Sequence, residues 1–189
     1  MQKDSMVKEM PDTVLINAGK YMLRKLEPDD SAALFPTFSN EEACRFLSRP
    51  HFDSEVALRA WLVDPDWNGR SWVAIDKSDN AVVGRFVAVP AGDDQVTELG
   101  YITVTERQGR GIARTCTAAL ISHLFERENH RRVFAEIDSK NLASIALAER
   151  LGFTREACLR EHERTHNGLC DMLVYGLLRR EWSSDSQLQ

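Results

Sequence analysis

The stretch Arg107-Gln108-Gly109-Arg110-Gly111-Ile112-Ala113 lies between two segments of different character. The preceding segment, Val96–Val104, reads as a strand, and the following one, Ala113–Arg127, repeats apolar residues at helical spacing. Glycines between a strand and a helix let the backbone approach a ligand, and the first N–H groups of a helix attract anions. The stretch therefore predicts a cradle for a pyrophosphate, to which Arg107 and Arg110 add positive charge.

Two common phosphate motifs do not fit this loop. A P-loop ends in Gly-Lys-Ser/Thr, whereas Gly111 is followed by Ile112 and Ala113. A dinucleotide fingerprint that starts at Gly109 needs a glycine at position 114, which is an arginine. The pattern Gln/Arg-x-x-Gly-x-Gly/Ala does fit, and here the chain resembles the GNAT family of acyl-CoA-dependent N-acetyltransferases. The alternative interpretation is an ordinary loop that caps a helix.

A second segment carries the same resemblance. Asn141-Leu142-Ala143-Ser144, followed by Leu151-Gly152-Phe153, looks like the family's Asn-x-x-Ser/Ala…Leu-Gly-Phe segment, whose asparagine contacts the pantetheine arm of the coenzyme. Asn141 is also a natural helix N-cap with Ser144 three residues on, and the two roles are compatible. Two matching segments in the expected strand–helix contexts extend the resemblance over roughly residues 20–182.

The resemblance implies acetyl-CoA as co-substrate and assigns its contacts. Main-chain groups of Ile102 and Val104 are expected to meet the thioester and the pantetheine, and Asn141 and Ser144 are expected to bind the arm. The pyrophosphate contacts are expected from the loop residues Gln108, Gly109, Arg110, Gly111, Ile112 and Ala113.

Within the family the chain looks most like the RimJ/RimL-type branch, which acetylates protein N-terminal amines. The markers are Glu98-Leu99-Gly100-Tyr101, Ser144, and Gly168 followed by Asp171 and Tyr175. Many family members carry a tyrosine acid seven residues after the asparagine, and that position is Ala148 here. The resemblance therefore makes Ser144 the candidate acid for the leaving thiolate.

Glu98 is the candidate general base, because its strand must pass the acetyl group. The alternative is a carboxylate that only binds the amine, or a solvated strand residue. Deprotonating a lysine-like amine of pKa about 10.4 costs about 4.6 kcal/mol at pH 7, against about 1 kcal/mol for an α-amine. A weak base therefore suffices for an N-terminal amine.

Composition limits the alternatives. The 189 residues suit one domain, with 43% hydrophobic and 28% charged residues, and the net charge of −5 argues against nucleic-acid binding. No segment is long and apolar enough to span a membrane, and reduced thiols predict a cytoplasmic location. No metal site is expected, because neither a CxxC pair nor a histidine cluster joins the cysteines Cys44, Cys116, Cys158 and Cys170.

The element order predicts an α/β fold of GNAT type, with a mixed, mostly antiparallel sheet of about seven strands flanked by helices. Residues 1–13 are expected to be a flexible segment, 14–182 a single acetyltransferase domain and 183–189 a polar tail. A helix is expected to begin at Asn40, and the dipeptide Asn167-Gly168 predicts a hairpin.

The predicted function is acetyl transfer from acetyl-CoA to a primary amine by direct attack in a ternary complex. The preferred acceptor is a protein N-terminal α-amine. One rival is a small-molecule amine such as a polyamine or an aminoglycoside, which the acidic balance mildly favours, and another is a catalytically silent acyl-CoA sensor. A homodimer is a further expectation, since dimers are common in the branch.

Overall fold

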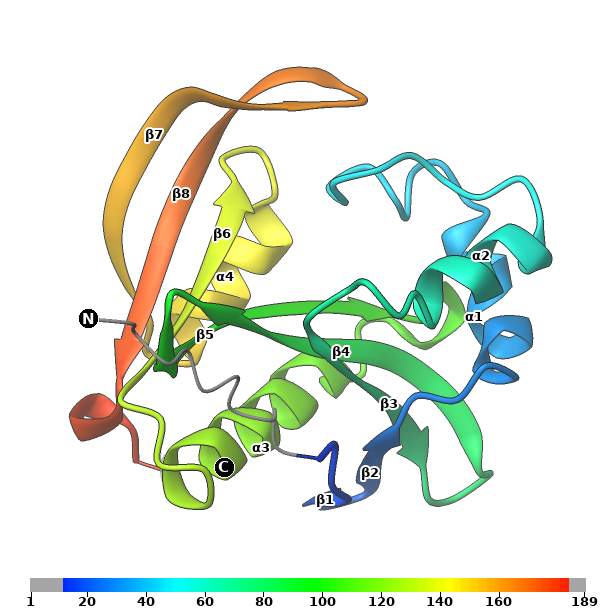
Figure 1. Cartoon of the computed structure of the whole chain (residues 1–189), viewed down its shortest axis with the longest axis horizontal. Coiled ribbons are helices and arrows are strands. Elements are labelled where there is room, and N and C mark those ends of the chain that lie inside the picture. Colours follow the sequence, from blue (N-terminus) through cyan, green and yellow to red (C-terminus); the bar gives the residue numbers. More distant parts are fainter. Residues whose placement is uncertain (1–11, 184–189) are drawn as a thin grey trace, which may run out of the picture.

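A computed structural model describes residues 12–183, which form one eight-stranded sheet in the order β1-β2-β3-β4-β5-β6-β8-β7 (Figure 1). Only β5 and β6 pair in parallel. The strands are β1 (Ile16–Ala18), β2 (Tyr21–Lys25), β3 (Arg70–Asp76), β4 (Ala81–Ala91), β5 (Asp93–Thr103), β6 (Arg132–Asp138), β7 (Thr154–Thr165) and β8 (Gly168–Leu178). The helices are α1 (Asp30–Phe38), α2 (Glu55–Leu62), α3 (Ile112–Glu126) and α4 (Leu142–Arg150), and single 3₁₀ turns follow at Thr105–Arg107 and Arg179–Glu181.

The two faces of the sheet carry separate cores. Strand β3 shows the division, because Trp72 and Ala74 belong to the core under α3 and α4, while Val73 and Ile75 belong to the core under α1 and α2. Side chains of a strand alternate between its faces, so a strand covered on both sides is apolar throughout. The helices thus lie in two layers around the sheet, which confirms the predicted fold class.

Two local predictions differ from the structure. The sheet has an eighth strand, β1, which is too short to leave a periodic signal. Residues 41–46 form turns instead of a helix. Asn40 caps the segment, with its side chain accepting from the Ala43 N–H at 2.9 Å, but only the Cys44 N–H makes a four-residue bond, and the bonds after it span three residues. Strand β4 also includes Pro90, opposite Thr97, where a proline is tolerated because a non-hydrogen-bonded pair position needs no N–H donor.

The β7–β8 hairpin forms as predicted, but its turn lies one residue earlier. Thr165 pairs with Gly168, so His166 and Asn167 make the two-residue loop, and Gly168 follows it with φ +99°. The register predicted from an Asn167-Gly168 turn is therefore wrong. Cys158 lies opposite Leu173 and Cys170 opposite Glu163, and the cysteines of the described chain, Cys44, Cys116, Cys158 and Cys170, are all free thiols.

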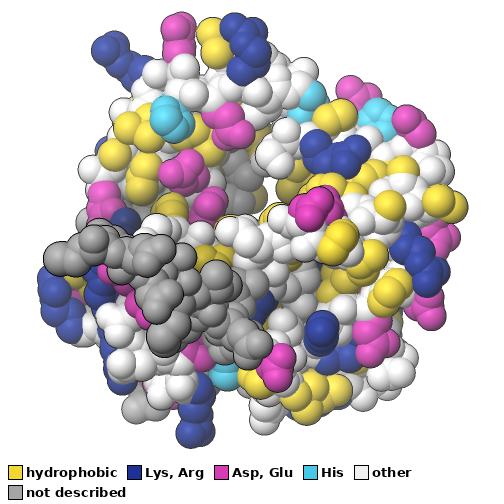
Figure 2. Space-filling model, in the orientation of Figure 1, with side chains coloured by type: hydrophobic (Ala, Val, Ile, Leu, Met, Phe, Trp, Pro, Cys, Tyr) yellow, Lys and Arg dark blue, Asp and Glu magenta, His cyan; other side chains and the backbone are white. Residues whose placement is uncertain are grey.

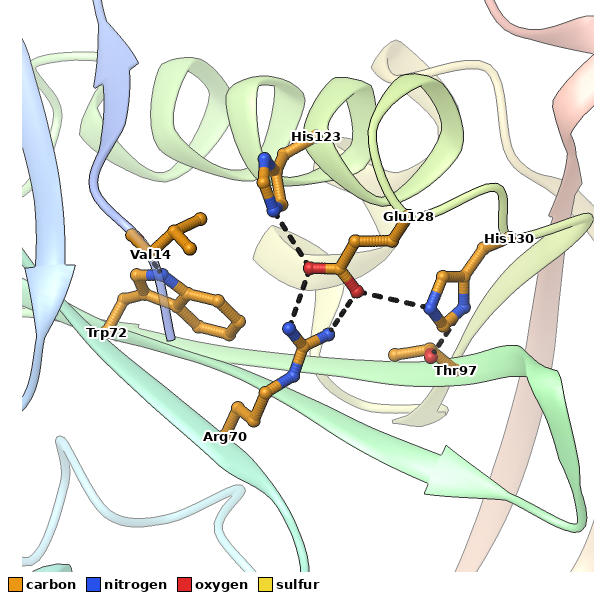
Figure 3. A network of polar contacts seen from close by, with 7 residues as sticks. All are labelled: Val14, Arg70, Trp72, Thr97, His123, Glu128 and His130. Carbon is orange, nitrogen blue, oxygen red and sulfur yellow. Dashed lines mark hydrogen bonds and ion pairs between the residues drawn. The ribbon is translucent and has the colours of Figure 1, made fainter. Parts of the chain in front are cut away.

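A buried polar network joins β3 to the loop after α3 (Figure 3). Glu128 accepts two hydrogen bonds from Arg70, both at 2.7 Å, and lies 2.8 Å from His123 and 3.4 Å from His130. His130 in turn bonds to Thr97 of β5 at 3.0 Å. The network therefore fixes the loop before β6 against the strand that carries Glu98.

The predicted flexible segment falls mostly outside the described residues, as does most of the predicted polar tail. None of the helices between residues 12 and 183 has the length and apolar character needed to cross a membrane. In the same range, no three side chains of His, Cys, Asp or Glu gather closely enough to hold a metal ion.

Candidate functional site

The parallel strands β5 and β6 separate in the middle of the sheet. They pair only over three residues, from Val96↔Arg132 to Glu98↔Phe134, although β5 continues to Thr103. In Figure 1 the two strands diverge beyond this point, and Figure 2 shows the same face hollowed between the β7–β8 hairpin and the α1–α2 side. The rest of β5 therefore presents an unpaired edge to a hollow.

Two hydrogen bonds show which residues of β5 face this edge. The Gln95 carbonyl accepts from Arg131, next to β6, and the Val104 N–H donates to Val83, next to β4, both at 3.0 Å. Main-chain groups alternate in direction along a strand. Tyr101 and Thr103 therefore direct their N–H and C=O groups toward the open edge. The main-chain groups of Ile102 and the Val104 N–H, expected to meet the coenzyme, point toward β4 instead, and the Val104 carbonyl accepts from the Arg107 N–H at 2.9 Å.

The glycine loop has the shape of an anion cradle. Gly109 and Gly111 have φ of +74° and +76°, and nothing lies within 4 Å of where a side chain would begin. Gly111 is the N-cap of α3 and supplies no capping side chain, so the first N–H groups of this 15-residue helix are not covered by one. The Ile112 side chain is buried in the core, so only its main chain is available to a ligand.

The charges beside the loop differ from the expectation. Arg107 forms an ion pair with Asp79 at 2.7 Å, so its charge is largely neutralised. Arg110 is exposed and makes no ion pair with any described residue. Arg114, in the first turn of α3, has a buried Nε with no hydrogen-bond partner among residues 12–183. Arg110 and Arg114 are thus the cations that an anion in the loop would meet.

Asn141 caps α4, as predicted, and its Oδ1 accepts from the Ser144 N–H at 3.1 Å. The Ser144 side chain is hydrogen-bonded to the hydroxyl of Tyr101. Burial raises the pKa of Tyr101, and the bond to Ser144 opposes this shift only in part. Tyr101 also stacks on Phe86 at 6.4 Å between ring centroids. The candidate acid Ser144 is therefore one member of a hydroxyl pair that remains protonated at neutral pH.

Glu98 lies on the opposite face of β5 from Tyr101. Burial raises the pKa of the Glu98 carboxyl, and the negative charges of Glu136 and Glu163 raise it further. A carboxylate with a raised pKa is better matched to accepting a proton near neutral pH. Acidic side chains gather along the hairpin side of the hollow in Figure 2. The position of Glu98 beside the strand separation is compatible with both roles considered for it.

A cavity of about 240 Å³ opens on the Glu98 face, between β4, β5 and the α1–α2 layer. Its floor comes from β4 and β5, where Arg85, Val87 and Val89 lie opposite Ile102, Gly100 and Glu98. Its lining residues are Phe38, Leu47, Ser48, Trp61, Asp64, Trp67, Arg85, Val87, Val89, Gly100, Tyr101 and Ile102.

Sequence reasoning missed three residues of this site. Tyr101 appears there only within a branch marker, although its place three residues after Glu98 puts it on the opposite face of the strand. Trp61 has the sequence signature of a core or rim residue, and Arg85 that of an ordinary strand residue. An arginine within the apolar run Val82–Val87 was the available signal, because a charge inside a buried strand requires a partner.

The chain matches known proteins over most of its length. The family described as Acetyltransferase (GNAT) domain matches residues 20–154. An uncharacterised N-acetyltransferase, p20, of Bacillus licheniformis is 26% identical over 85% of this chain and 94% of its own length. A putative ribosomal N-acetyltransferase, YdaF, of Bacillus subtilis is 34% identical, but over only 49% of this chain and 52% of its own length.

Solved structures agree with this fold. A putative acetyltransferase from T. thermophilus superposes with a TM-score of 0.83 and 27% identity, over 95% of this chain and 97% of its own. Spermidine N-acetyltransferase from Vibrio cholerae, solved with CoA and spermine, superposes with a TM-score of 0.74 and 20% identity, over 86% of this chain and 97% of its own. Ribosomal-protein-S5-alanine acetyltransferase from Vibrio fischeri superposes with a TM-score of 0.74 and 18% identity, over 90% of this chain and 99% of its own. With the family match covering most of the chain, and with the separated strands and the glycine loop in place, this chain belongs to the GNAT family of acetyltransferases.

Proposed function

We propose that this chain transfers the acetyl group of acetyl-CoA to the α-amine of a protein N-terminus. Bound acetyl-CoA would supply the activated acyl group as a thioester. The observation that carries the mechanism is the arrangement around β5, where Glu98 lies on one face of the strand and the Tyr101–Ser144 pair on the other. A base for the amine and an acid for the thiolate thus flank one strand edge.

The coenzyme would lie along the open edge of β5. The N–H groups that begin α3, together with the main chain of Gly109 and Gly111, would bind the pyrophosphate, and Arg110 and Arg114 would add charge. Main-chain groups of Tyr101 and Thr103 would hold the pantetheine and the thioester, in place of those of Ile102 and Val104. An N–H group aimed at the reacting carbonyl would stabilise the developing oxyanion.

Proton transfer needs only modest catalysis for an α-amine. Glu98 would remove the amine proton directly or through a water, and its raised pKa favours this near neutral pH. Tyr101 would deliver a proton to the leaving thiolate, with Ser144 orienting its hydroxyl. A cysteine nucleophile is a poor alternative, since Cys116 is buried in α3 and burial raises its pKa to about 12.

The acceptor is the part of this proposal that relatives support least. The similar structures include a ribosomal-protein acetyltransferase and a spermidine acetyltransferase, and at 18% and 20% identity both indicate the fold alone. The α-amine is favoured because a single half-buried carboxylate is a weak base. A small-molecule amine is the second candidate, favoured by the cavity on the face of β5 that carries Glu98.

The test is thiol release from acetyl-CoA with three acceptors, which are an N-terminal peptide, spermidine and an aminoglycoside. Preferred turnover of the peptide is the expected result. Turnover of spermidine alone would replace the protein acceptor with a polyamine. Tight binding of acetyl-CoA with no release in any of the three would instead indicate an acyl-CoA sensor.

A further inference from the structure

Arg85 is a buried cation without an anionic partner. Its side chain rises from the middle of β4 and the residue is only 8% exposed. Nε and Nη2 both bond to the Ser71 hydroxyl, at 3.2 and 2.8 Å. Across residues 12–183, no carboxylate lies within ion-pair distance of its guanidinium. A neutral hydroxyl satisfies part of the hydrogen-bonding capacity of this group and none of its charge.

Aromatic rings surround the same guanidinium. The centroids of Trp61 and Trp67 lie 4.6 and 5.2 Å from its central carbon. Burial lowers the pKa of Arg85 to about 10, so the group is still positively charged at neutral pH. Burying an uncompensated charge destabilises a fold, and strongly perturbed ionisable groups concentrate at functional sites.

The unpaired charge faces a cavity. Arg85, Trp61 and Trp67 all line the cavity described above, and Asp64, at its margin, is its one carboxylate. Asp64 is exposed to solvent and is not within ion-pair distance of Arg85. An anion that entered the cavity would therefore meet a desolvated guanidinium with planar donors suited to a carboxylate.

Arg85 also shares a face of the sheet with Glu98. Arg85 lies opposite Ile102 on β5, and Glu98 is four residues before Ile102 on the same face. At the usual rise per residue, the two positions are separated by roughly 13 Å along the strand. Glu136 and Glu163 make the Glu98 end negative, so this face has one end suited to an ammonium group and another suited to an anion.

We propose that Arg85 binds a carboxylate of the acceptor, so that the preferred acceptors carry a carboxylate as well as the amine that is acetylated. This inference rests on the proposed function, because it takes the cavity as the acceptor site. The carboxylate has two sources, which are the α-carboxylate of a free amino acid and the acidic side chain of an N-terminal residue. A polyamine would place a second cation beside Arg85, which argues against spermidine.

The experiment compares Arg85→Met with Arg59→Met. Arg59 lies on α2, is half exposed and pairs with Asp29 at 3.0 Å, so it is a matched surface control. Acetylation is measured with two acceptor pairs. Glutamine against glutaminamide tests the α-carboxylate, and the peptide amide Glu-Ala-Ala against Gln-Ala-Ala tests the side-chain carboxylate.

The expected result is a preference for the carboxylate member of one pair, by about tenfold to a hundredfold in kcat/KM. Arg85→Met should reduce this ratio to near one, and Arg59→Met should preserve it. The KM for acetyl-CoA should stay the same in both variants. No preference in either pair, or a preference that survives Arg85→Met, would overturn the proposal.

A binding measurement separates this proposal from the transferase itself. Tryptophan fluorescence, which Trp61 and Trp67 make sensitive to the cavity, is titrated with N-acetylglutamate and with uncharged N-acetylglutaminamide. Tighter binding of N-acetylglutamate to the wild type than to Arg85→Met would support the carboxylate site even if no acceptor turned over. Equal affinity of the wild type and Arg85→Met for N-acetylglutamate would refute the carboxylate site, whatever the activity of the two proteins.

Loss of folding is not expected to obscure the test. Replacing an unpaired buried charge with an apolar side chain of similar length should leave the melting temperature unchanged or raise it. Arg85→Lys is the second variant, because it retains the charge and loses the planar fork, and an intermediate ratio is expected from it.

Discussion

Replacing Glu128 with glutamine should unfold the protein at a much lower temperature. Glu128 is 10% exposed and receives both hydrogen bonds of Arg70, which is 7% exposed. Glutamine keeps the shape of the side chain but removes the charge, which leaves the Arg70 guanidinium buried and unpaired. Breaking a buried pair in this way typically costs about 3–5 kcal/mol.

That cost converts into a large thermal shift. A domain of this size loses about 2–4 °C in melting temperature per kcal/mol, so Glu128→Gln should lower it by roughly 6–20 °C. A matched control lies on the surface, where Arg132 donates the same pair of hydrogen bonds to Glu156, at 2.7 and 2.6 Å. Because Glu156 is 39% exposed, Glu156→Gln should cost less than about 1 kcal/mol.

The assay is unfolding of both variants, followed by circular dichroism on heating and in urea. Equal shifts for Glu128→Gln and Glu156→Gln would refute the reasoning, since burial would then not decide the cost. The double variant Arg70→Met/Glu128→Leu adds a second check. Removing both charges together should restore most of the stability, because no unpaired ion remains.

The pH dependence of the same pair has a defined sign. Burial alone would raise the pKa of Glu128, but hydrogen bonds from His123, His130 and Arg70 outweigh it and hold this pKa well below its usual range. A carboxyl whose pKa is depressed in the folded state stabilises the protein above its unfolded pKa. This stability is lost as the pH falls toward the folded value. The stability of Glu128→Gln should therefore fall less steeply in acid than that of the wild type.

Three further predictions concern activity. Glu98→Gln should lower kcat by about a hundredfold and abolish the rise of kcat/KM with pH. Glu136→Gln should move that rise to lower pH, because it removes a charge that raises the pKa of Glu98. An unchanged pH profile in both variants would exclude Glu98 as the base. Gly111→Asp should raise the KM for acetyl-CoA by about tenfold or more, through strain at φ +76° and repulsion of the pyrophosphate, and an unaltered KM would contradict the cradle. Tyr101→Phe should lower kcat more than Ser144→Ala does, and the reverse order in steady-state kinetics would return the acid role to Ser144.

The conformation of the glycine loop and its surroundings was predictable because the signals for it are local. A glycine at the start of a helix, an asparagine at an N-cap and a glycine after a helix each act within a few residues, and the structure has Gly111, Asn141 and Gly152 in these places. Hydrophobic alternation likewise predicted seven of the eight strands. The segment 41–46 was mispredicted because the Asn40 cap that signals a helix start is present, but the residues after it continue with three-residue bonds.

The rest of the site depends on which strands become neighbours. Nothing near Glu98 in the sequence reveals that Glu136 and Glu163 lie close enough to raise its pKa. Nor does it reveal that Ser144, in the first turn of α4, meets Tyr101 of β5. The direction of the main chain along β5 follows from its bonds to partners on either side. The sequence therefore could not reveal that the main-chain groups of Tyr101 and Thr103, and not those of Ile102, face the open edge.

The sequence alone thus determined the family, the glycine loop at the start of a helix and Glu98 as a candidate base, because helix starts and strand periodicity depend on residues close together in the chain. Only the tertiary structure decided that Arg85 is a buried charge without a partner and that Trp61 and Trp67 enclose it. Desolvation and ion pairing depend on distances between residues far apart in the chain, and those distances exist only once the sheet and its helices have packed.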